Sequence, residues 1–141
     1  MEKKAFLYAL LTALIWGLAP AFEKMGLKGR IDPYVGVVMR TIPIAVIGIT
    51  GLLFMGRLRD IAAADTRSIL FVITGGLLAG FLGQLSFYSA LKSGEASVVV
   101  PLAATYPLVA LFISVLFLGE SFTWQKLVGI GMIVGGVIFV R

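Results

Sequence analysis

The amino-acid sequence predicts an all-α, polytopic membrane protein, a bundle of five transmembrane helices. Hydrophobic residues make up 60% of the 141-residue chain and charged residues only 13%, whereas soluble domains average about 45–50% apolar and about 25% charged. Several uncharged runs approach the roughly 20 residues that a helix needs to cross a bilayer. These runs far exceed the 9 to 11 residues of a barrel strand and lack its alternation, which favours helices.

The composition also excludes several classes of function. The chain has no cysteine and no histidine, which removes disulfides, thiolate or imidazole metal sites, cysteine nucleophiles and histidine bases. We therefore expect no enzyme activity, no cofactor and no metal. The net charge of +5 comes in small groups between apolar runs, a pattern of membrane topology and not of nucleic-acid binding.

Five helices account for the apolar runs, in a single domain over residues 1–141. We expect them over residues of about 5–25, 34–55, 68–91, 96–118 and 121–140. The last is the weakest, because only Leu127 to Val140 is uncharged; Trp124 and Lys126 suit an interfacial start, and Arg141 suits a terminal anchor. The connections are short and leave no room for an extramembrane domain.

The first helix carries a polar stripe. At 100° per residue, Thr12, Trp16, Pro20 and Glu23 share a narrow face that should point away from lipid. Pro20 frees the carbonyl of Trp16, so we expect a bend there. Two interpretations of Glu23 stay open: a functional carboxylate, or a solvated helix end together with Lys24.

The second helix contains Arg40, one to two turns inside its apolar run. A charge within a membrane segment costs on the order of 2.5 to 3.5 kcal/mol on insertion scales, so it needs a reason to stay. Arg40 could extend its side chain to the headgroups, or it could be a cation that faces a cavity. The sequence leaves both interpretations open.

The third and fourth helices have distinguishable features. In the third, Gly76, Gly80 and Gly83 form a small-residue packing face, while Gln84 and Tyr88 gather on another side, which we interpret as a cavity face. The fourth carries two prolines six residues apart, Pro101 and Pro107, beside Tyr106. It is therefore the helix that we most expect to be bent, with the bend at Pro101.

The order of these motifs resembles a known family. The first half of the chain is similar to the first half of an EamA-type domain in Trp16-Gly17, Phe22, Lys24, Asp32-Pro33 and Arg40. The second half is similar in Tyr88-Ser89-Ala90-Leu91, Ser93-Gly94, Ala96-Ser97, Val100-Pro101-Leu102, Tyr106-Pro107, Leu118-Gly119-Glu120, Lys126 and Gly129. The resemblance covers essentially the whole chain.

The chain thus resembles the single-domain, five-helix bacterial and archaeal transporters of the drug/metabolite transporter superfamily. Larger members carry two such domains in inverted orientation, which implies that one five-helix chain is half of an inverted-repeat transporter. The resemblance does not extend to Glu23, which stands where we expect a small apolar residue in the family. The glutamate of the four-helix small multidrug exporters has no obvious counterpart in the middle of the first helix.

We therefore expect a secondary transporter of a small metabolite or drug-like solute in the plasma membrane, working by alternating access as a homodimer. The expected substrate-binding residues are Trp16, Gln84, Tyr88, Tyr106, Arg40 and Lys24, and Glu23 is the candidate for ion coupling. The two cations favour an anionic or zwitterionic solute. The alternative is a non-transporting membrane scaffold, or a partner subunit of a heteromeric transporter, which would not need inward-facing polar groups.

The loop charges bear on how the two copies insert. One side of the five-helix topology carries six cations (Lys3, Lys4, Arg57, Arg59, Arg67 and Lys126) and the other carries five (Lys24, Lys28, Arg30, Lys92 and Arg141). Orientation follows the Lys/Arg imbalance of short loops, which is almost absent here. We expect copies inserted both ways, forming an antiparallel dimer; the competing interpretation is one fixed orientation with a cytoplasmic N-terminus.

Overall fold

The computed structural model describes residues 2–140, and these are 83% helical with no strands. This confirms the all-α membrane fold. Within the described residues, four helices are long and apolar enough to cross a membrane: Lys3–Leu27, Pro33–Phe54, Thr66–Ser93 and Ala96–Phe117. The fifth, α8 (Trp124–Val137), has only 14 residues and is shorter than the predicted 121–140. Arg141, the expected anchor, lies outside the described residues, as does Met1.

The chain forms two compact units. Residues 22–92 form one, which we call the hairpin unit; residues up to Ala21 and from Ser93 onward form the other, the terminal unit. The division falls within α1 (Lys3–Leu27), one residue after Pro20, although the helix is uninterrupted there. A bend of the helix axis at Pro20 stays a prediction.

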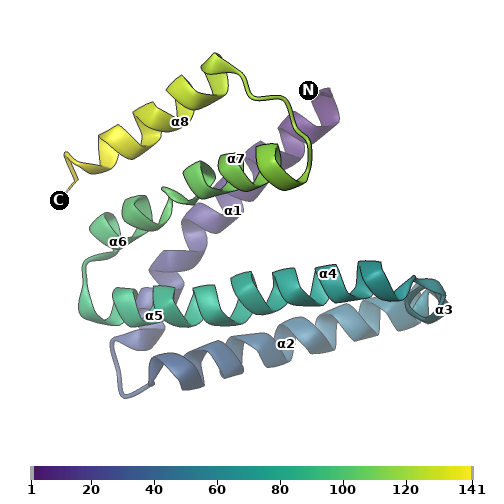
Figure 1. Ribbon diagram of the computed structural model, residues 1–141. Coiled ribbons are helices and arrows are strands. Elements are labelled where there is room, and N and C mark those ends of the chain that lie inside the picture. The colour runs from purple at the N-terminus through teal and green to yellow at the C-terminus, as the bar shows by residue number, and fades with distance from the viewer. Residues whose placement is uncertain (1, 141) are drawn as a thin grey trace. The chain divides into compact units, whose positions relative to one another are not determined.

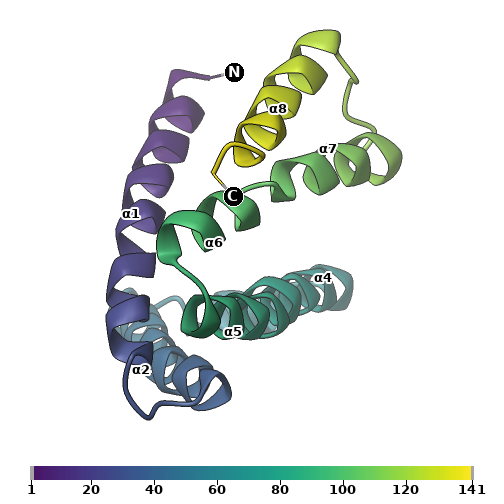
Figure 2. The same cartoon turned by 90° about the vertical axis from the view of Figure 1, so that its left-hand side faces the viewer.

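In the hairpin unit, α2 (Pro33–Phe54) runs beside the third span in the opposite direction (Figures 1 and 2). Asp32 caps α2 by accepting a hydrogen bond from the Tyr34 backbone N–H at 2.9 Å, and Pro33 suits the first helical turn. A short helix, α3 (Leu58–Ala63), lies in the connection after α2. The sequence predicts only a loop over this stretch.

The third span departs from the predicted continuous α-helix. It consists of α4 (Thr66–Gly76), the π-helix η1 (Leu77–Gly83) and α5 (Gln84–Ser93). A π-helix bonds each N–H to the carbonyl five residues back, so it turns more widely than an α-helix. The 100° spacing that predicted two faces for this span therefore does not hold across η1.

In the terminal unit, the predicted fourth helix is two helices, α6 (Ala96–Ala103) and α7 (Tyr106–Phe117). Pro107 has no N–H, so the carbonyl of Ala103 loses its helical partner. The chain tightens instead, and the Thr105 N–H bonds the Leu102 carbonyl at 3.3 Å. The interruption thus lies between the two prolines. Pro101 is inside α6, and a bend at Pro101 itself stays a prediction.

α8 contacts both α6 and α7 within the terminal unit (Figures 1 and 2). It begins at Trp124 because Thr123 is its N-cap and accepts a hydrogen bond from the Lys126 N–H at 3.3 Å. This cap explains why the helix starts later than predicted.

The interior of the chain is small. Among the described residues, the buried large apolar side chains are Leu27, Val37, Tyr88 and Leu91 in the hairpin unit and Leu111 in the terminal unit. Most other large apolar side chains are exposed. Such exposure suits a lipid-facing surface.

Candidate functional site

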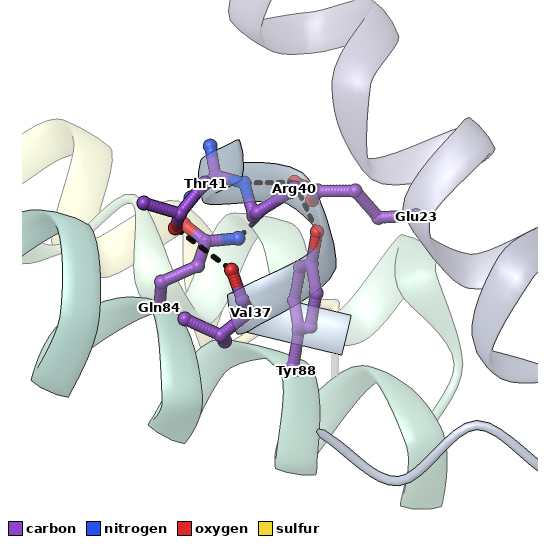
Figure 3. Close-up of polar contacts among 6 residues, drawn as sticks. All are labelled: Glu23, Val37, Arg40, Thr41, Gln84 and Tyr88. Atoms are coloured by element: carbon purple, nitrogen blue, oxygen red, sulfur yellow. Dashed lines mark hydrogen bonds and ion pairs between the residues drawn. The ribbon is translucent and has the colours of Figure 1, made fainter. Parts of the chain in front are cut away.

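Polar side chains from three helices of the hairpin unit meet around one carboxylate (Figure 3). The Oε1 atom of Glu23, near the end of α1, accepts hydrogen bonds from Gln84 Nε2 and Tyr88 Oη, each at 3.1 Å. Arg40 Nε of α2 lies 3.8 Å from the same oxygen. We call these four residues the Glu23 cluster.

Helical spacing explains how the donors reach Glu23. Gln84 and Tyr88 are four residues apart on α5, so they lie on the same face. Arg40 follows Val37, a fully buried residue of α2, by three positions and therefore shares the inward side of its helix. Thr41, the next residue, donates its hydroxyl to the Val37 carbonyl at 2.8 Å. Its hydroxyl is therefore used within α2, and Arg40 is the residue of α2 that contacts Glu23.

A glycine makes room for the phenol. A Cβ atom built at Gly36 would lie 3.1 Å from two ring carbons of Tyr88 and 3.3 Å from Leu27. The absence of a side chain at Gly36 thus lets the Tyr88 ring pack directly on α2. Gly36 is not among the residues predicted from the sequence, although its place one turn before Arg40 puts it on the same face.

The cluster borders a pocket of about 250 Å³ within the hairpin unit. The lining combines one acid, one base and one phenol with apolar residues and glycines: Glu23, Gly26, Leu27, Ile31, Gly36, Met39, Arg40 and Tyr88. The Glu23 side chain is 14% exposed and that of Arg40 is 33% exposed. The guanidinium is therefore the more accessible of the two charges.

The cluster balances its own charge. A half-buried carboxylate needs donors and an opposite charge to replace part of its water, and Glu23 has two hydrogen bonds and a guanidinium. Arg40 likewise faces a carboxylate from within the apolar span Pro33–Phe54. Between the two interpretations that the sequence left open, this geometry favours an inward-facing Arg40, and it gives Glu23 partners beyond solvent.

Two lysines connect the helix ends. Lys24 donates its Nζ to the Leu91 carbonyl near the end of α5, and Lys92 donates to the Ile31 carbonyl at 2.7 Å. Cations are favourable at carbonyl-rich helix C-termini. Lys24 therefore joins α1 to α5 beside the cluster, and its ammonium is occupied by a backbone acceptor.

The remaining predicted site residues lie elsewhere. Trp16 and Tyr106 belong to the terminal unit, where their side chains are exposed. The structure thus brings together Glu23, Arg40, Gln84 and Tyr88, with Lys24 next to them along the chain, and it describes Trp16 and Tyr106 in a separate unit. Within residues 2–140, no group of three or more Asp, Glu, His or Cys side chains is placed to hold a metal ion.

Comparisons with known proteins agree with this architecture. The model of the EamA-like transporter family matches residues 3–141. An uncharacterized protein of Methanocaldococcus jannaschii is 29% identical over 95% of this chain and 93% of its own length. An uncharacterized transporter of Sinorhizobium sp is 28% identical over 93% of this chain and 92% of its own. A UDP-galactose transporter homolog of Candida albicans is 25% identical, over 49% of this chain and 19% of its own. No solved structure matches significantly.

Proposed function

The chain belongs to the EamA-like transporter family, and we propose that it is a secondary transporter whose solute site is the Glu23 cluster. It is a multi-pass integral membrane protein of a transporter family. Beyond this family membership, we propose the location of the solute site, the class of solute, the transport mechanism and the assembly of the chain. We place it in the plasma membrane, where it moves a small metabolite or drug-like solute by alternating access.

The observation that carries the proposal is a charged and hydrogen-bonded cluster at the wall of a pocket. Placing Arg40 and Glu23 within apolar helices costs free energy, on the order of 2.5 to 3.5 kcal/mol for an unpaired charge. A scaffold that only packs against another protein does not require charged residues in its apolar helices. A pocket that binds a polar solute does require them, because the solute needs groups that can pair with it.

The charges of the pocket favour a small zwitterionic or anionic solute. Arg40 is the accessible cation, and a solute carboxylate could replace Glu23 as its partner. A solute that also carries an ammonium could pair with the Glu23 carboxylate that is released. Apolar residues such as Leu27, Ile31 and Met39 would contact the rest of the solute. Lys24 contributes positive potential from beside the pocket.

Glu23 is the candidate for ion coupling. A proton on its carboxylate would remove the charge that Arg40 faces at 3.8 Å and would leave the guanidinium open to an anion. Loss of the proton would restore the internal pair. Proton and solute would then bind in a linked manner, as coupling in a secondary transporter requires.

Two copies complete the transporter in this proposal. Five helices correspond to one half of an inverted repeat, and nearly equal cation counts in the loops allow insertion in both orientations. Trp16 and Tyr106 are proposed as further cavity-lining residues. Reporter fusions at the C-terminus, one active only in the cytoplasm and one only outside it, test the dual insertion; activity of a single reporter would exclude it.

A transport screen tests the function. Cells expressing the chain are challenged with a panel of metabolites and toxic compounds, alongside cells expressing Arg40→Gln. The matched control is Arg59→Gln, which removes the same charge from the exposed helix α3. We expect a solute whose uptake or tolerance depends on the wild-type chain and on the control alike, and is lost with Arg40→Gln. Equal behaviour of both variants would exclude the cluster as the site, and no response to any compound would favour the scaffold alternative.

A further inference from the structure

The π-helix η1 directly precedes the two residues of α5 that donate to Glu23. It ends at Gly83, and Gln84 is the next residue. From this arrangement we infer that η1 sets the rotational register of α5, and that Gly83 is a positioning residue for the Glu23 cluster. The inference concerns the geometry of the site, and it depends on the proposed function only where transport is measured.

The geometry of helices gives the reason. Each residue of an α-helix turns the chain by about 100°, and a π-turn accommodates one residue more than an α-turn. If residues 77–83 wound as an α-helix, α5 would rotate by about 100° relative to α4. Gln84 and Tyr88 lie on the same face, so both would leave Glu23 together.

Gly83 is the residue that the wide turn requires. A Cβ atom at this position would lie 2.9 Å from the carbonyl oxygen of Leu78, five residues earlier. That oxygen belongs to the backbone, so it can move away from the Cβ atom only if the backbone of the π-turn changes its conformation. Gly80, in the same π-helix, has open space around its Cβ position. A Cβ atom therefore fits at Gly80 but not at Gly83.

A cysteine pair can report the register of α5. The chain has no native cysteine, and a Cβ at Gly36 would lie next to the Tyr88 ring. The parent for this test carries Gly36→Cys and Tyr88→Cys, and disulfide formation is measured in membranes under mild oxidation. We expect the parent to cross-link, since the two helices face each other at these positions. Absence of the disulfide in the parent would contradict the register itself.

Two alanine variants of the parent separate Gly83 from its neighbour. With Gly83→Ala we expect cross-linking at least about tenfold slower, because a rotation of about 100° moves the cysteine introduced on α5 out of disulfide range. With Gly80→Ala we expect the rate of the parent. A parental rate with Gly83→Ala would overturn the inference.

A deletion provides the rescue. Removing Ala79 from η1 takes out the extra residue of the wide turn, so the span can wind as an α-helix while α4 and α5 keep their faces. Alanine is favourable in an α-helix, so the Ala79 deletion should cross-link equally with Gly83 or with Gly83→Ala. Comparing the Ala79 deletion with and without Gly83→Ala tests the role of η1 even if Gly83→Ala alone fails to fold. A combined variant as defective as Gly83→Ala would contradict the role of η1.

Transport separates this inference from the proposed function. Cross-linking needs no solute, so a chain that transports nothing could still show the rescue. Gly83→Ala in the cysteine-free chain should lose transport of the solute found in the screen, and the additional Ala79 deletion should restore it. Rescue of cross-linking without any transport would support the register and exclude the solute site.

Discussion

Two ion pairs, one in each unit, have the same separation and very different surroundings. Arg40 Nε lies 3.8 Å from Glu23 in the hairpin unit, and Lys126 Nζ lies 3.8 Å from Glu120 in the terminal unit. The first pair is 33% and 14% exposed and the second 41% and 53%. Glu23 also accepts hydrogen bonds from two side chains of α5.

The difference teaches that surroundings, and not distance, decide what an ion pair does. Exposed pairs contribute about 0 to 1 kcal/mol, because water and salt screen them. A pair shielded from water leaves an uncompensated charge when one partner is removed, which is far more costly. The Glu23 cluster is therefore the place where single substitutions should have large effects.

The largest expected effect is on stability, at Glu23. Glu23→Leu should lower the free energy of unfolding by about 2 kcal/mol, less than for a fully buried pair because the remaining Arg40 is one-third exposed. Glu120→Leu should change it by less than about 1 kcal/mol. Chemical unfolding in detergent measures both, and equal effects would mean that the two pairs do not differ.

The next effect concerns the packing of Tyr88. Gly36→Ala should cost about 1 to 2 kcal/mol, because the added methyl meets the ring at 3.1 Å. Gly48→Ala on the same helix has open space and should be neutral or slightly stabilising, since alanine favours helices. Thermal unfolding of the two variants compares them. A neutral Gly36→Ala would show that the ring can move without loss.

A smaller effect concerns one hydrogen bond. Tyr88→Phe removes a donor to Glu23 and keeps the ring, so we expect a loss of about 1 kcal/mol. The control is Tyr8→Phe on an exposed position of α1, which should leave stability unchanged. If both variants unfold at the same denaturant concentration as the wild type, the phenol hydroxyl makes no net contribution to the cluster.

The smallest effect is pH-dependent and lies outside the membrane spans. Hydrogen bonds from the Ser68 side chain and backbone N–H lower the pKa of Asp65, the N-cap of α4, below its usual value of 3.8. The ionised cap therefore stabilises α4 fully above that value, and the contribution is lost as the pH falls through the lowered pKa.

Asp65→Ala should thus lower the melting temperature slightly at pH 6, and the difference from wild type should shrink as the pH falls below 3.8. The comparison in the terminal unit is Thr123→Ala, which removes an uncharged cap from α8 and should cost the same at every pH. A constant difference for Asp65→Ala across the pH range would contradict the role of its charge.

The apolar runs were enough to predict the fold. Among the described residues, the four long spans lie near the predicted ranges, although the third contains η1 and the fourth is divided into α6 and α7, because a long apolar run leaves a membrane segment few alternatives to helix. The break between α6 and α7 was expected in the right helix, but its position depends on which carbonyl loses its partner to a proline. The late start of α8 depends on Thr123 acting as a cap and not as a helical residue.

The site was predictable only in part. Gln84 and Tyr88 share a helix, so spacing alone placed them together. Spacing cannot show that Glu23, grouped with Trp16 on the first helix, turns toward residues more than 60 positions away. Nor does it reveal η1, because its residues are all apolar or glycine and show no polar face whose period would mark a wider turn; the close approach at Gly83 appears only in the structure.

Uptake by the double variant Glu23→Leu with Arg40→Leu tests the central claim most directly. Removing both partners leaves no unpaired charge, so the variant should be more stable than Glu23→Leu alone, although Gln84 and Tyr88 lose their acceptor. It can then be reconstituted in liposomes beside the wild type and the double variant Glu120→Leu with Lys126→Leu. We predict that uptake of the screened solute falls at least about tenfold in the first variant, a loss of about 1.4 kcal/mol or more, and is retained in the second. Wild-type uptake by a folded Glu23→Leu, Arg40→Leu chain would contradict the proposal that this cluster binds the transported solute.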